Sequence, residues 1–171
     1  MTKNKQQMTN NFKLRQATPT DVPVLFELIL ALAKYEKLSH TVTGNIDNLQ
    51  EHLFGAKPYG EAIIAAYGEE AVGFALFFHN YSTFLTKPGI YIEDIFVMPE
   101  FRRMGIGKAI LKYIAELAVN RDCGRLEWSV LDWNESAIAF YEEMGSQVLP
   151  DWRICRITGD SLTQLAGQRS V

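Results

Sequence analysis

The sequence predicts a mixed α/β fold with a mostly antiparallel central sheet that is flanked by helices. Two apolar, β-favouring runs, Glu61–Tyr67 and residues 71–79, are separated by Gly68-Glu69-Glu70, which predicts a hairpin. A third run follows at residues 89–98 and extends the hairpin to a meander. Helical patterns precede and follow these strands, because apolar residues recur there at three- and four-residue steps.

The N-terminal part of the chain predicts one strand and two helices before the meander. Residues 12–17 alternate between apolar and polar side chains, as in a half-buried strand. Residues 18–21 are cap-type residues, and the helix that they introduce has one apolar face, formed by Val22, Leu25, Leu28, Ile29, Leu32 and Tyr35. A shorter helix is predicted over Ile46–Phe54, because Gly55 and Pro58 end its pattern.

After the meander, the pattern returns to helix and then to a further strand. An amphipathic run has its apolar face along Ile106, Ile110, Tyr113, Ile114 and Leu117. Residues 125–131 favour a strand. Asn134 is a good N-cap for a helix over residues 135–144, and Gly145 is a good stop for it.

The last part of the chain predicts two closing strands and a short helix. The strands are expected at residues 147–149 and 153–158, and Asp160 is placed to cap the helix. No repeat, low-complexity linker or block of like charges divides the chain. We therefore expect a single domain over residues 12–166.

Composition is typical of a globular protein, with 47% apolar and 22% charged residues among 171. The net charge of −3 gives no electrostatic argument for nucleic acid or for an anionic membrane. No segment reaches the roughly 18 apolar residues that a membrane span needs. Residues 1–11 are polar and rich in amides, so we expect a disordered lead instead of a secretory signal, and a cytoplasmic location.

The residues that most often bind metals are scattered. Cys123 and Cys155 have no metal-ligand spacing and do not indicate a disulfide framework. His40, His52 and His79 are better explained as surface or core residues than as ligands. We expect no metal site.

The segment Arg102-Arg103-Met104-Gly105-Ile106-Gly107 joins a predicted strand to a predicted helix. A helix start leaves backbone N–H groups unpaired at the positive end of the helix dipole, and glycines let a phosphate oxygen approach them. The segment does not fit G-x-x-x-x-G-K-[ST], and it does not fit G-x-G-x-x-G because Ile110 stands at the last position. It predicts a pyrophosphate-binding turn of another kind.

The remaining pattern, R-x-x-G-x-G, resembles the acetyl-CoA signature of the GCN5-related N-acetyltransferase (GNAT) family. Residues 91–97 before it and residues 134–141 after it occur in the order and spacing expected of that family. Residues 33–36 and 151–153 resemble the diamine (spermidine/spermine) N-acetyltransferase branch in particular. The resemblance implies the GNAT fold, acetyl-CoA as the acetyl donor, and a homodimer that builds its substrate pocket at the subunit interface.

Acetyl transfer to an amine needs a base, because a primary alkylamine has a pKa of about 10.4 and is charged at neutral pH. Glu93 is the candidate base, since it lies on the strand that leads to the glycine turn. Its neighbour Asp94 points to the opposite face of a regular strand, unless a bulge re-aims it. An ordinary exposed acidic pair is the alternative.

The resemblance makes Tyr141 the catalytic tyrosine, a general acid for the leaving thiolate. A phenol with a pKa near 10 keeps its proton at neutral pH and can give it to a thiolate. Periodicity alone would make Tyr141 a core aromatic, because it shares a helix face with Ala137 and Met144.

The resemblance also implies a set of groups that hold acetyl-CoA: Ile95, Phe96 and Val97 toward the pantetheine amides, Arg102, Arg103, Met104, Gly105, Ile106, Gly107 and Lys108 around the phosphates, and Asn134 and Ser136 at the CoA arm. Two of these residues have a simpler interpretation. Asn134 also serves as a helix cap, and Lys108 also fits a solvated helix surface.

For the acceptor, Tyr35, Glu36, Glu93, Asp94 and Trp152 match the pocket of the polyamine branch. Two departures weaken the case for a tri- or tetra-amine: residues 80–83 lack an expected acid, and the segment before Trp152 is shorter and less acidic. A smaller diamine, or an amino acid with a side-chain amine such as thialysine or a lysine-like compound, is therefore as well supported as a polyamine. Trp152 could pack over an alkylammonium or fill a core.

The function predicted from the sequence is direct acetyl transfer to a small primary amine in a ternary complex, because no cysteine suits a covalent intermediate. Two alternatives remain open. One is a non-catalytic acyl-CoA-binding or regulatory module. The other is a protein acetyltransferase that acts on lysine side chains or N-terminal amines.

Overall fold

The computed structural model describes residues 12–167, which form two compact units that we treat separately, one ending at Ser129 and one beginning at Val130. The predicted disordered lead, residues 1–11, lies outside the described residues. The first unit contains five strands, β1 Phe12–Gln16, β2 Glu61–Tyr67, β3 Glu70–Ser82, β4 Lys87–Val97 and β5 Leu126–Trp128. Its helices are α2 Val22–Tyr35, α3 Ile46–Phe54 and α4 Ile106–Asn120, with 3₁₀ turns η1 Pro19–Asp21, η2 Ser39–Thr41 and η3 Pro99–Phe101.

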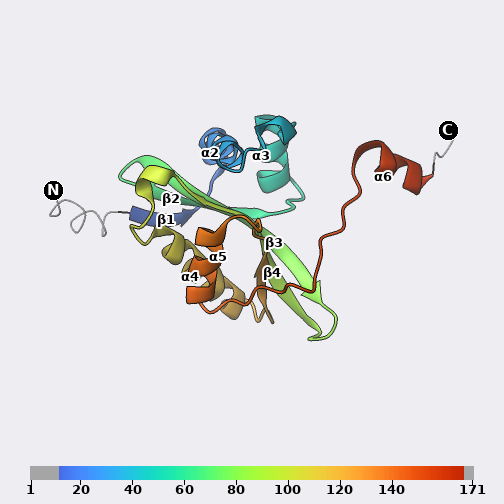
Figure 1. Cartoon of the computed structure of the whole chain (residues 1–171). Coiled ribbons are helices and arrows are strands. Elements are labelled where there is room, and N and C mark those ends of the chain that lie inside the picture. Colours follow the sequence, from blue (N-terminus) through green and yellow to red (C-terminus); the bar gives the residue numbers. More distant parts are fainter. Residues whose placement is uncertain (1–11, 168–171) are drawn as a thin grey trace. The chain divides into compact units, whose positions relative to one another are not determined.

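The strands form one sheet in the order β1-β2-β3-β4-β5 (Figure 1). Neighbours from β1 to β4 are antiparallel, which confirms the predicted meander, and β5 is parallel to β4. The β5 strand has three residues, so the strand predicted over residues 125–131 is shorter than expected. The parallel pairing extends only from Ile90 to Ile92 on β4.

Helices cover the sheet on both faces. The core on one face packs α2 and α3 against β2, β3 and β4 through Leu25, Leu28, Leu32, Leu53, Ala62, Ile64, Phe74 and Phe96. These two helices lie together on one side of the sheet in Figure 1. The apolar stripe of α4, which includes the fully buried Ile110 and Ile114, packs against β4 and the other long strands. Both helical patterns read from the sequence are therefore confirmed.

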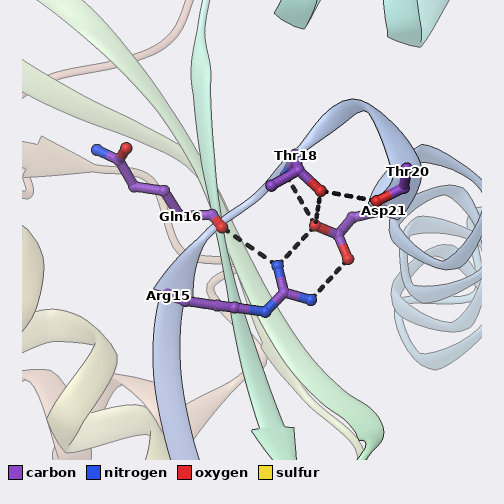
Figure 2. Close-up of polar contacts among 5 residues, drawn as sticks. All are labelled: Arg15, Gln16, Thr18, Thr20 and Asp21. Atoms are coloured by element: carbon purple, nitrogen blue, oxygen red, sulfur yellow. Dashed lines mark hydrogen bonds and ion pairs between the residues drawn. The ribbon is translucent and has the colours of Figure 1, made fainter.

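The entry into α2 is fixed by one ion pair, shown in Figure 2. The Arg15 guanidinium donates to both carboxylate oxygens of Asp21, at 2.6 and 2.7 Å, and the Thr18 backbone N–H donates to the same carboxylate at 2.7 Å. The guanidinium and the Thr18 groups hold the pKa of Asp21 well below its usual range, although burial opposes them. This contact ties β1 to the helix that carries Tyr35 and Glu36.

The second unit contains α5 Glu135–Glu143 and α6 Gly159–Ala166. Asn134 caps α5 by accepting from the Ala137 N–H at 3.3 Å, and Gly145 follows the helix with a φ of 93°, as predicted. The two predicted closing strands, residues 147–149 and 153–158, are not formed. A strand needs a neighbour for its backbone groups, and residues 130–167 contain no strand that could provide one.

No helix of the described residues is long and apolar enough to cross a membrane. Within residues 12–167 there is also no group of three or more histidine, cysteine or acidic side chains that could hold a metal ion.

Candidate active site

The strand β4 carries a bulge at the acidic pair. On β3, Leu76 pairs with Asp94 and the next residue, Phe77, pairs with Ile92, so Glu93 is an extra residue without a partner across the ladder. A bulge of this kind bends the strand and changes the face to which the following side chains point. The sequence analysis left open whether a bulge re-aims Asp94. The structure has a bulge at this pair.

The bulge places Asp94 on the face covered by α2. Residues paired across antiparallel strands share a face, and Leu76 packs in the α2 core, whereas its neighbour Phe77 points to the other face. Asp94 therefore shares a face with Leu76, while Ile92, two residues earlier, shares the face of Phe77. In a regular strand Asp94 and Ile92 would lie on the same face.

Three carboxyl groups of the first unit, those of Glu36, Glu93 and Asp94, lie near enough for their charges to interact. Burial, together with the negative charges of Glu93 and Glu36, raises the pKa of Asp94 to about 6. Burial also raises the pKa of Glu36, which is the C-cap residue of α2. Glu93 is exposed. Grouped acids of this kind favour a cationic ligand, because its charge relieves their mutual repulsion.

Beyond the bulge, β4 has a free edge. It pairs with β3 as far as Val97, but its pairing with β5 ends at Ile92. No other strand of residues 12–167 pairs with the β5 side of residues 93–97. Because backbone groups alternate between the two sides of a strand, alternate residues among Ile95, Phe96 and Val97 offer theirs to an extended ligand that adds to the edge as a strand would.

The glycine turn follows this edge. Arg103 and Gly105 have positive φ angles of 62° and 83°, and Gly105 is the N-cap residue of α4. The first backbone hydrogen bond of the helix runs from the Ala109 N–H to the Gly105 carbonyl at 3.0 Å. The N–H groups of Ile106, Gly107 and Lys108 precede that bond and lie at the positive end of the helix dipole.

The Arg102 side chain turns back toward the acidic side of the site. Its Cζ lies 4.2 Å from the centroid of the Tyr35 ring and 5.7 Å from that of Phe96. Its Nε donates to the Val97 carbonyl at 2.9 Å. The sequence analysis assigned Arg102 only a charge near the phosphates. It missed the contact with Tyr35 because that contact joins segments more than sixty residues apart.

The second unit holds the remaining predicted residues. Tyr141 is buried on α5 beside the ring of Phe140, at a centroid distance of 5.3 Å. Asn134 accepts a hydrogen bond from the Ser136 hydroxyl at 3.2 Å in addition to capping the helix. Trp152 is 79% exposed and is not part of a core within its unit.

The first unit therefore brings together Tyr35, Glu36, Glu93 and Asp94 with the predicted acetyl-CoA groups of β4 and the glycine turn. The Phe96 side chain joins the end of α2 to the core of the sheet. Its ring centroid lies 6.3 Å from that of Tyr35 and 6.5 Å from that of Phe74. The sequence named Phe96 for its backbone alone. Its place in an aromatic run with Tyr35 follows from the pairing of β3 with β4.

Comparison with known proteins decides the family. The model of the acetyltransferase (GNAT) family matches residues 29–146, which include the glycine turn, both carboxylates of β4 and Tyr141. The chain belongs to the GNAT acetyltransferase family. It is an acetyltransferase, and the family implies an acyl-CoA donor.

Several curated relatives are similar over most of the chain. The L-ornithine N5-acetyltransferase NATA1 of Arabidopsis thaliana is 36% identical, with 88% of this chain and 86% of the relative covered. The thialysine N-epsilon-acetyltransferase of Mus musculus is 35% identical, with coverage of 91% and 98%. The spermidine/spermine N(1)-acetyltransferase-like protein 1 of Homo sapiens is 26% identical over 95% of this chain but only 25% of its own length.

Solved structures agree with the fold. An integron cassette protein of V. cholerae superposes with a TM-score of 0.77 at 22% identity, covering 92% of this chain and 98% of its own. An aminoglycoside acetyltransferase from a soil metagenomic sample superposes with a TM-score of 0.70 at 18% identity, covering 86% and 98%. At these identities the likeness extends to the GNAT fold and no further.

Proposed function

We propose that this acetyltransferase transfers the acetyl group of acetyl-CoA to a primary amine of a small cationic substrate, by direct transfer in a ternary complex. The observation that carries the proposal is the convergence of Glu36, Glu93 and Asp94 on the strand that leads into the glycine turn. Acids next to a phosphate-binding turn suit a positive acceptor and a negative donor on adjoining parts of one site.

The donor is held mainly by backbone groups. The N–H groups of Ile106, Gly107 and Lys108, with Arg103 and Met104 beside them, would bind the pyrophosphate. The free edge at Ile95, Phe96 and Val97 would pair with the pantetheine amides. Asn134 and Ser136 would contact the CoA arm, as the family resemblance implies.

The acceptor binds as an ammonium ion and must lose a proton before it attacks. Glu93, the exposed residue of the bulge, accepts that proton directly or through a water molecule. The neutral nitrogen then attacks the thioester carbonyl, so that a C–N bond forms and the C–S bond breaks. Tyr141 gives its phenolic proton to the departing CoA thiolate. The nitrogen, positively charged once the C–N bond has formed, loses its second proton, which restores Tyr141, and Glu93 returns the first proton to solvent.

Among the candidate acceptors, an amino acid with a side-chain amine and a small diamine both fit three acids. The relatives named for ornithine and thialysine are more similar to this chain than the one named for spermidine and spermine. We therefore rank a side-chain amine of an amino acid first and a diamine second. Tyr35 and Trp152 would contact its alkyl chain.

We further propose that the enzyme acts as a homodimer. The family resemblance suggests it, and the C-terminal segment supports it, because its large apolar side chains, Trp152, Ile154, Ile157, Leu162 and Leu165, are more than half exposed. Exposed apolar groups in this number are typical of a surface that another chain covers.

Steady-state kinetics with acetyl-CoA and a panel of amines tests the proposal. The panel contains ornithine, thialysine, lysine, putrescine and spermidine, with mass spectrometry to locate the added acetyl group. We expect acetylation at the side-chain amine, with the highest kcat/KM for an amino acid. Binding of acetyl-CoA without acetylation of any amine, free or in a peptide, would instead indicate a non-catalytic module.

A further inference from the structure

The Arg102 side chain makes contacts that a simple phosphate-binding charge does not need. Its Cζ lies over the Tyr35 ring, 4.2 Å from the ring centroid, and its Nε–H donates a hydrogen bond to the Val97 carbonyl at 2.9 Å. A guanidinium over a ring face is held there by the cation–π attraction, and the hydrogen bond fixes its direction. Arg103 and Lys108, in contrast, are exposed, whereas Arg102 is half-buried.

These contacts connect two parts of the site that the chain keeps far apart. Tyr35 is the last residue of α2, and Glu36, the next residue, belongs to the acid cluster. Val97 is the last residue of β4, at the end of the edge assigned to the thioester arm. Arg102 itself precedes the left-handed residue Arg103, where the glycine turn begins.

Aromatic packing continues the connection into the core. The Tyr35 ring lies 6.3 Å from Phe96, whose ring lies 6.5 Å from Phe74 in the core under α2. Arg102 covers the outer end of this run and is 5.7 Å from the Phe96 ring as well. The end of α2 is thus packed between the core and a side chain that belongs to the donor turn.

We propose that Arg102 is a positioning residue that holds the end of α2, and with it Glu36, against the end of β4, and so couples the amine side of the site to the acetyl-CoA side. The inference deepens the proposed function and rests on it. It differs from the role expected of this arginine, because a free positive charge near the phosphates would affect the donor alone.

Arg102→Lys is the first test, because it keeps the charge but loses the planar stack and the Nε–H. We expect Michaelis constants for acetyl-CoA and for the best amine that are both raised, roughly fivefold or more. Arg103→Gln, which removes an exposed charge from the same turn, should raise the constant for acetyl-CoA alone. The inference is overturned if Arg102→Lys raises the Michaelis constant for acetyl-CoA alone, as Arg103→Gln does, or if it changes neither constant.

Tyr35→Leu is the second test and stands even where Arg102→Lys does not fold. Tyr35 has no predicted contact with acetyl-CoA, so weaker acetyl-CoA binding by calorimetry is expected only if Tyr35 supports Arg102. In the double variant Tyr35→Leu with Arg102→Lys, the loss of acetyl-CoA affinity should be smaller than the product of the two single losses, because both substitutions remove the same contact. Unchanged acetyl-CoA binding in Tyr35→Leu contradicts the inference. Because this measurement needs no acceptor, it separates a failed inference from a failed substrate assignment.

Discussion

The donor side and the acceptor side of the site are built in different ways. The proposed donor side is a run of neighbouring residues, 102–108, with backbone N–H groups at the start of one helix. The proposed acceptor side is made of side chains from the end of α2 and from β4, where a bulge turns Asp94 toward the helix. Backbone recognition depends on local conformation, and side-chain recognition depends on how distant segments pack.

The two neighbouring carboxylates of β4 also differ from each other, in their exposure to solvent. Glu93 is exposed at the bulge, whereas Asp94 is partly buried and has a pKa raised to about 6 by burial and by the charges of Glu93 and Glu36. In the proposed mechanism, the exposed Glu93 exchanges protons with solvent and substrate, and Asp94 meets the bound cation. Adjacent positions in the sequence would then serve different parts of one reaction.

The largest effect is expected where donor and acceptor react. Tyr141→Phe removes the proposed general acid and keeps the ring, so kcat should fall by roughly 10²-fold or more. The Michaelis constant for acetyl-CoA should change little, since the ring still packs beside Phe140. Phe140→Leu on the same helix is a control for packing. An unchanged kcat in Tyr141→Phe would remove Tyr141 from the mechanism.

An effect on the donor side alone is expected from Gly105→Ala. An alanine at a φ of 83° costs about 1–2 kcal/mol, and here the strain falls on the turn that is proposed to hold the phosphates. The KM for acetyl-CoA should rise by roughly 5- to 10-fold, with the KM for the amine unchanged. Gly68→Ala is the matched control, because Gly68 has a φ of 62° in the β2–β3 turn and equally open surroundings. It should lower stability without changing either constant.

A smaller effect, on stability, is expected from Asp94→Asn on the acceptor side. The folded-state pKa of about 6 exceeds the usual 3.8, so the folded protein binds more protons than the unfolded chain between these values. Stability of the wild type therefore falls as pH rises from about 4 to 6, and the penalty persists at neutral pH. Without ligands, Asp94→Asn should melt roughly 5 °C higher at pH 7.5. The difference should vanish below pH 4, and a lower melting temperature at pH 7.5 would contradict the account.

Local patterns in the sequence were sufficient for most of the fold. The helix over Ile46–Phe54 has the predicted bounds, and the helix ending at Tyr35 follows its apolar spacing, because periodicity and caps are properties of short segments. The glycine turn could be predicted for the same reason. The closing strands at residues 147–149 and 153–158 could not, since β propensity does not supply the neighbour that a strand needs.

The acceptor side was predicted only in part. Glu36 and Asp94 were named from the resemblance, but the face to which Asp94 points depended on a bulge whose position is set by the pairing of β3 with β4. The stack of Arg102 on Tyr35 has no sequence signal, because nothing in either segment specifies the other. Contacts of this kind come from tertiary packing and have to be read from the structure.

Glu36→Gln, with both substrates varied, is the most direct test of the claim that side-chain acids choose the acceptor while the backbone turn holds the donor. Loss of one charged contact to the amine should lower kcat/KM for the amine by about 10- to 100-fold. The KM for acetyl-CoA should stay within about twofold of the wild type, and Glu27→Gln, an exposed acid on the same helix, should have no effect. A kcat/KM for the amine that does not change in Glu36→Gln, or a KM for acetyl-CoA that rises as much as that for the amine, would contradict the claim.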